Sequence, residues 1–363
     1  MYDLPPQALL ELYQIARNVI LRADLDTYDE EVLRQILAAL EKGRREIAWR
    51  FEHSVATMKD WTADRLEQLF YEFDDMSLGV RTALAESIAE AAGYAGEAAT
   101  AAHSDILSLG RRVAGFEAVA LTASQYRAFF AETPLGGHFL QGWVDRAFTG
   151  SMQRAMLTDL QAGVLQGEGY QSLVRRLTQG FDLFKDEAVT LARTYVQTAN
   201  VTASQMVAQA NSGILRGWRW CATLEHGYRA SGRGTCLVCA ALDGQEFEMG
   251  KGPVIPKHPR CRCYPVWLTK TWRELGIDID ELEEAVRPYT VRPDQNIDAG
   301  GRRTILESGF HQGNYAEWLM GRSEEVKLNA LGPGRYELLK AGKIGFADLV
   351  DGQGRLRTLK ELR

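Results

Sequence analysis

The sequence contains no run of about 18 apolar residues, so it offers no segment that would cross a membrane as a helix. Its first six residues lack the basic start and the apolar stretch of a secretory signal. We therefore expect the chain to fold in a reducing cytoplasm, where clustered cysteines favour metal binding over disulfides. It also lacks a glycine-rich phosphate loop, which argues against an NTPase of that class.

No single sign of charge dominates the chain, because 48 acidic and 42 basic residues give a formal net charge of −6. An acidic chain has no overall attraction for nucleic acid, so any such role would depend on a local patch. Basic residues outnumber acidic ones between 211 and 273, and they include Lys257, Arg260 and Arg262. Two interpretations of this patch stay open: contacts with DNA phosphates, or a solvated basic face around an anionic cysteine cluster.

Cysteine is scarce, yet four of the five cysteines lie in one short segment. Two residues separate Cys236 from Cys239, and His258, Cys261 and Cys263 follow after a loop rich in glycine and proline. Such spacing directs several soft ligands at one centre and predicts a structural zinc site. The alternatives are a chance cluster of small buried cysteines and a disulfide pair, which would need an oxidising compartment.

The cluster offers five ligands for the four positions of a tetrahedral zinc ion. We favour Cys236, Cys239 and Cys261 with either His258 or Cys263, and the sequence leaves that choice open. If Cys263 is left out, its side chain is expected to point the other way along its strand. A catalytic zinc keeps an open position beside a base, so a filled, sulfur-rich shell predicts a structural ion and no enzymatic activity.

Most of the remaining chain is predicted to be helical, because apolar residues recur at spacings of three and four. The predicted helices cover 7–22, a segment from Thr27, a segment from Thr62, 150–166, 170–178, 184–211 and 271–287. The alanine-rich stretch 83–102 contains Gly93 and Gly96, and small side chains allow two helices to approach closely.

After Gly213 large and small residues alternate, which is typical of strands. Strands are expected over 218–224, near 245–247 and over 263–267. A module of this size cannot build a large core, so a bound metal would supply folding energy.

We therefore predict a mainly α fold with a small zinc-stapled α+β module, long N-terminal helices and short strands around the cysteine cluster. The predicted domains are an elongated helical bundle or coiled coil over 1–110, a helical region over 111–212, a zinc-binding β-rich module over 213–270, a helix and linker over 271–300, and a small α+β tail over 301–363.

These motifs together resemble those of the phage head morphogenesis family, the minor head proteins similar to protein F of phage Mu. The resemblance covers roughly residues 150–363. It is carried by Trp218, Thr235-Cys236-x-x-Cys239, Ala241-Leu242-Asp243-Gly244 and His258-Pro259-x-Cys261-Arg262-Cys263. The chain departs from the family pattern at Gly232 and Gly234, where members commonly carry Asp and Arg, and at Tyr195, where many carry Glu.

The resemblance implies a virion protein that is made in the host cytoplasm and lies inside the head near the portal. Its implied role is head morphogenesis with DNA packaging or ejection, and region 111–212 would be the helical head-morphogenesis region. The implied partners are the portal and other capsid proteins, with double-stranded DNA as a further candidate; no membrane or small-molecule substrate is expected. The alternative is a zinc-dependent nucleic-acid-binding or processing protein.

Two enzymatic alternatives have weaker support in the sequence. Glu246 and Glu248 have the two-glutamate spacing of ADP-ribosyltransferases, but the arginine and Ser-Thr-Ser companions of that site are not suitably placed. A nuclease of the His-Asn-His type would need more histidines near the cysteines than His226 and His258.

Overall fold

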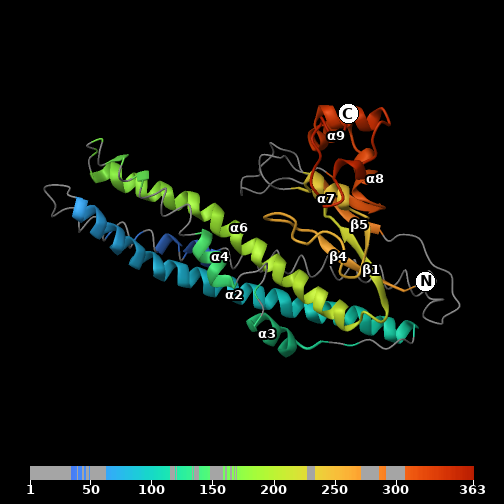
Figure 1. The fold of residues 1–363 in the computed structure, drawn as a ribbon, viewed down its shortest axis with the longest axis horizontal. Coiled ribbons are helices and arrows are strands. Elements are labelled where there is room, and N and C mark those ends of the chain that lie inside the picture. Colours follow the sequence, from blue (N-terminus) through green and yellow to red (C-terminus); the bar gives the residue numbers. More distant parts are fainter. Residues whose placement is uncertain are drawn as a thin grey trace. The chain divides into compact units, whose positions relative to one another are not determined.

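The computed structural model shows a mostly helical protein with two small sheets (Figure 1). It describes residues 34–38, 40–42, 45, 49, 63–114, 119, 121–132, 134, 139–147, 158–159, 162–163, 166, 168, 170–226, 234–270, 286–291 and 307–363. The chain divides into two compact units. Unit 1 includes 99–122 and 203–363, and unit 2 comprises 22–98 and 123–202.

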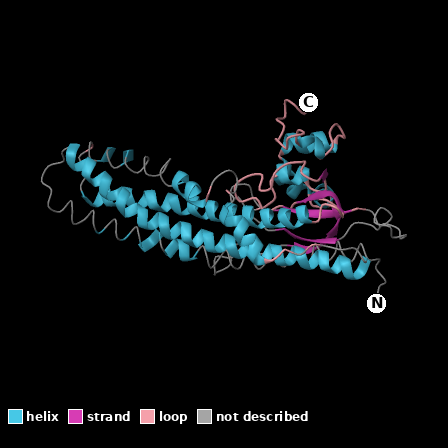
Figure 2. Cartoon of the chain, turned by 60° about the horizontal axis from the view of Figure 1, so that its bottom comes forward, coloured by secondary structure: helices cyan, strands magenta, loops and turns pink. Residues whose placement is uncertain are grey.

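Unit 2 is built from helices. Its elements are residues 63–98 of α2 (Ala63–Ala114), α3 (Ala123–Glu132), α4 (Leu140–Ala147) and residues 170–202 of α6 (Tyr170–Ala210). Figures 1 and 2 show α2 and α6 side by side, and both turn alanines inward. Over the described residues, no helix has the length and apolar character that a membrane crossing requires.

Small residues in α2 allow close packing in unit 2, as the sequence predicts. A Cβ atom on Gly96 would lie 1.8 Å from the ring of Tyr126, so the α3 ring occupies the space that a side chain would need. Tyr195 is 3% exposed and meets Trp143 edge-on, with ring centroids 5.6 Å apart. Tyr195 therefore belongs to the apolar packing.

Unit 1 contains an antiparallel sheet of order β3-β1-β4. Its strands are β1 (Leu215–Cys221), β3 (Glu246–Glu248) and β4 (Tyr264–Thr269), which confirms the three predicted strand positions to within a few residues. At Gly217 a Cβ atom would lie 2.3 Å from the carbonyl oxygen of Phe247, so this close approach requires glycine. The Trp267 indole donates to Ser204 Oγ over 2.8 Å and ties the sheet to the last turns of α6.

A second sheet, of order β2-β5-β6, joins segments far apart in the sequence. Strand β2 (Leu224–His226) pairs in parallel with β5 (Val286–Val291), and β5 pairs antiparallel with β6 (Glu307–Gln312). The sequence interpretation of 271–287 as a helix ending in a linker is wrong at residues 286–291. Four of its six residues are valine, tyrosine or threonine, which favour a strand once partner strands are available. Residues 271–285 lie outside the described part.

Other predicted helices differ in extent from those observed. Helix α6 runs without a break from Tyr170, so the predicted interruption between 178 and 184 is wrong, and Gly180 is accommodated within the helix. The predicted start near Thr62 is confirmed by α2. The predicted helix 7–22 lies outside the described residues, and of the helix from Thr27 the structure describes helical residues at 34–38, 40–42, 45 and 49.

The C-terminal part contains α8 (Tyr315–Met320), α9 (Glu324–Leu331), α10 (Pro333–Lys340) and the 3₁₀ turn η3 (Ala347–Leu349). The Asn314 side chain accepts from the Glu317 N–H and the Glu317 side chain accepts from the Asn314 N–H, a capping box that begins α8. Val350 and Leu356 form an antiparallel bridge around residues 351–355.

Candidate metal centre

The first part of the centre, residues 236–239, is the start of helix α7 (Leu237–Leu242). Cys236 is the N-cap residue, and its sulfur accepts the Cys239 N–H at 3.4 Å. Free N–H groups of a first helical turn favour a negatively charged sulfur there. We call residues 236–239 the first knuckle.

The second part, residues 258–261, is a tight turn that we call the second knuckle. The Cys261 N–H donates to the His258 carbonyl over 3.1 Å, and Arg260 takes the left-handed backbone conformation that the turn needs, with φ of 60°. His258 Nδ1 lies 2.8 Å from the Pro259 carbonyl, a bond in which the ring nitrogen donates. This bond leaves Nε2 facing the cysteines, as is usual for metal-binding histidines.

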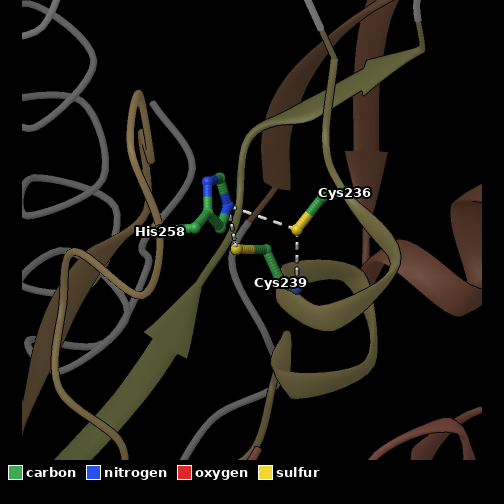
Figure 3. Close-up of side chains that lie close together, drawn as sticks. All are labelled: Cys236, Cys239 and His258. Atoms are coloured by element: carbon green, nitrogen blue, oxygen red, sulfur yellow. Dashed lines mark hydrogen bonds between the residues drawn. The ribbon is translucent and has the colours of Figure 1, made fainter. Parts of the chain in front are cut away.

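Sulfur and nitrogen atoms of the two knuckles converge on one point (Figure 3). His258 Nε2 lies 3.2 Å from both Cys236 Sγ and Cys239 Sγ, and Cys239 Sγ lies 3.8 Å from Cys261 Sγ. Two thiolates on a tetrahedral zinc, each about 2.3 Å from the ion, are separated by about 3.8 Å. The residues present therefore fit a tetrahedral ion of this kind.

All five candidate ligands are brought together in two groups that share Cys239. One group is Cys236, Cys239 and His258; the other is Cys239, Cys261 and Cys263, and the ligand atoms in each lie within 4.8 Å of one another. Cys263 therefore does not point away from the others, as was expected if this residue is left out of the shell. Residues two apart in extended backbone share a face, so Cys263 follows Cys261.

Hydrogen bonds among the groups of the centre shift their pKa values. Hydrogen bonds from Cys239 and His258 lower the pKa of the Cys236 thiol to about 4, and hydrogen bonds with Cys236 and Cys261 raise the pKa of His258 to about 11. The pKa of Cys239 is raised, because its thiol donates to the Cys236 sulfur. A metal ion must displace these protons to bind, so its affinity falls as the pH falls.

The centre is closed on its sulfur side. Cys239, Cys261 and Cys263 are 2%, 2% and 3% exposed, and all five cysteines of the chain are free thiols. Cys221, the fifth cysteine, is buried outside the cluster.

The residues proposed for DNA contact make contacts within the protein. Arg262 forms an ion pair with Glu225, and Lys257 Nζ donates to the Gln353 carbonyl over 2.8 Å. Arg260 is half-buried in the second knuckle. These side chains therefore help hold the module together, and DNA contact stays a prediction.

The two glutamates considered as an enzymatic pair lie in strand β3 and are ion-paired. Glu246 accepts from Arg216 and Arg219, each at 2.8 Å, and Glu248 pairs with Lys251 at 2.5 Å. They lie at the sheet edge in ordinary surface ion pairs.

Sequence reasoning gave no role to Asp243, which ends α7. This carboxylate is 6% exposed and accepts two backbone hydrogen bonds, from Ala222 at 2.7 Å and from Tyr315 at 2.6 Å. The one sequence feature that could have indicated a role for Asp243 was its position in the Ala241–Gly244 motif, four residues after Cys239.

Residues 154–266 match a family of proteins described as Phage Mu protein F like protein. The matched range contains both knuckles and Cys263, and it confirms the resemblance expected from their motifs. It points to a phage head-related protein. Searches of curated proteins and of solved structures gave no match.

Proposed function

We propose that the protein is a minor head protein of a tailed phage that acts in head morphogenesis and binds the portal. The family match over 154–266 carries this proposal, because it falls on the region with the motifs of such proteins. Location in the virion, contact with other capsid proteins and a part in DNA packaging or ejection follow from the same proposal. The long helices of unit 2 supply surface for docking on a protein assembly.

The cysteine cluster serves, in this proposal, as a structural zinc site and not as a reaction centre. Cys236, Cys239, His258 and Cys261 are its ligands, because the imidazole contacts Cys236 and Cys239 directly and hydrogen-bonds with Cys261. Cys263 is grouped with Cys239 and Cys261, and not with His258, so in this proposal it is an outer thiol. Bound zinc would cross-link the two knuckles, and this chain's residues would do no chemistry on it.

A zinc-dependent DNA-binding or processing protein is the second possibility, and the geometry does not favour it. Arg262 and Lys257 are engaged within the module, as described above. Glu225, the carboxylate joined to the second knuckle, is neutralised by Arg262 and is not placed as a free base. DNA contact by these side chains stays a prediction and does not carry the proposed role.

Co-assembly tests the proposal. The full chain would be expressed with the portal protein, and separately with the major capsid protein, of the same phage, and each mixture sedimented. Co-sedimentation with portal rings is expected, and the chain should also be detected in purified virions. Sedimentation of the chain as a free protein in both mixtures, with none of it in virions, would reject the role.

A further inference from the structure

Helix α7 belongs to the metal centre at one end and to the C-terminal part of the chain at the other. Its first turn carries Cys236 and Cys239, and six residues form the whole helix. Asp243 follows directly, with one oxygen accepting the Ala222 N–H and the other accepting the Tyr315 N–H. Because each oxygen takes a different backbone donor, the carboxylate joins the end of β1 to the start of α8.

Tyr315 is the buried residue through which the C-terminal segment, residues 314–363, meets the end of helix α7. Its side chain is 1% exposed. Burial raises the pKa of its hydroxyl, and the nearby negative charges of Cys236 and Asp243 add to this effect. A Cβ atom on Gly244 would lie 3.1 Å from Asn314 Cβ, so the two backbones meet closely at this point.

The second knuckle has its own link to the same segment. Lys257, the neighbour of His258, donates to the Gln353 carbonyl over 2.8 Å. Gly354 is buried beside this contact, where a Cβ atom would lie 3.2 Å from Lys257 Nζ and 3.5 Å from Leu242. Asp243, which follows the first knuckle, and Lys257, which precedes the second, thus each hold residues 314–363 through a hydrogen bond.

We propose that metal occupancy controls the docking of residues 314–363 on the cysteine module, with Asp243 and Lys257 as the positioning residues. This inference rests on the metal centre proposed above. The two knuckles are separate loops, and an ion bound by both fixes their relative position. Asp243 and Lys257 then lie at the distance from each other at which they can bond with the Tyr315 N–H and the Gln353 carbonyl. Removal of the ion frees the knuckles, and the C-terminal segment is released.

Coupling of this kind is reciprocal, because a segment that docks better on the metal-bound form must strengthen metal binding by the same factor. Loss of one docking contact should therefore weaken zinc binding even though the contact residue is not a ligand. A role limited to local helix capping would leave zinc affinity unchanged.

Hydrogen exchange of the full chain, with zinc and after chelation, tests the inference. We expect α8 amides and those near Gln353 to exchange at least about tenfold faster without zinc, and helix α6 between 188 and 199 to stay protected. Equal exchange of the α8 amides in a zinc-loaded and a zinc-free protein would overturn the coupling and leave the zinc site in place. A wild-type chain that binds no zinc would reject both.

Two variants separate coupling from folding. Asp243→Asn keeps the shape but presents an amide donor to one of the two N–H groups, and Lys257→Met keeps the stem but removes the donor. Each should release α8 or the Gln353 region and weaken zinc binding about tenfold. Asp348→Asn is the control, because Asp348 accepts only within its own turn, from Gly345 at 2.7 Å. Unchanged zinc affinity and exchange in Lys257→Met and in folded Asp243→Asn would overturn the inference.

Discussion

At the scale of single residues, the centre depends on which four of five ligands bind. Cys261 belongs to the group with Cys239 and Cys263 and also hydrogen-bonds with His258, whereas Cys263 is grouped with the two cysteines alone. The sequence favours Cys261 and leaves the choice between His258 and Cys263 open, because it shows spacing only. The position of the His258 ring, against Cys236 and Cys239, favours His258.

The different positions of Cys261 and Cys263 predict that serine substitutions of the two residues have unequal effects on zinc binding. Cys261→Ser should lose most of the bound zinc, whereas Cys263→Ser should keep about one equivalent, because one thiolate is removed from the shell only in the first case. Metal analysis of both purified variants, with Cys221→Ser as a buried control outside the cluster, is the measurement. Zinc lost from Cys263→Ser but kept in His258→Ala would show that Cys263 is the fourth ligand.

At the scale of elements, packing decides what the local sequence leaves open. Gly93 and Gly96 look alike in an alanine-rich helix, yet only Gly96 faces the ring of Tyr126. Likewise, β5 forms because β2 and β6 lie beside it. Periodicity predicts elements that bury a face along their own length, and it fails where a partner strand comes from a distant part of the chain.

The two glycines of α2 predict opposite changes in stability. Gly96→Ala should lower the free energy of unfolding by about 1–3 kcal/mol, because its methyl group would overlap the Tyr126 ring. Gly93→Ala has open space around its Cβ and should raise the free energy of unfolding by about 0.5–1 kcal/mol through helix propensity. Urea unfolding followed by circular dichroism compares them. Equal shifts in the two variants would contradict this assignment of the α2 faces.

At the scale of the whole molecule, the compact units do not follow chain order. Residues 99–122 join 203–363 in unit 1, while 123–202 belong to unit 2. The predicted domains are continuous stretches, whereas each long helix contributes to both units. The metal centre lies within unit 1 alone, so its effect on stability should be local.

Chelation should therefore act unequally on the two units. Removal of zinc is expected to lower the melting temperature of the transition that includes unit 1 by more than about 5 °C, since structural zinc supplies folding energy. Calorimetry with and without chelator, together with identification of tryptic fragments, would locate the change. Identical melting curves for verified zinc-loaded and zinc-free protein would show that the ion adds no stability.

The sequence by itself determined the mostly helical class, the strands near 218, 246 and 264, and the five candidate ligands. Each of these depends on local spacing, which is a property of the chain. Tertiary structure decided the links through Asp243 and Lys257, the pairing of Arg262 with Glu225, and the second sheet. These contacts join residues far apart in the sequence, and their geometry exists only once helices and strands have packed.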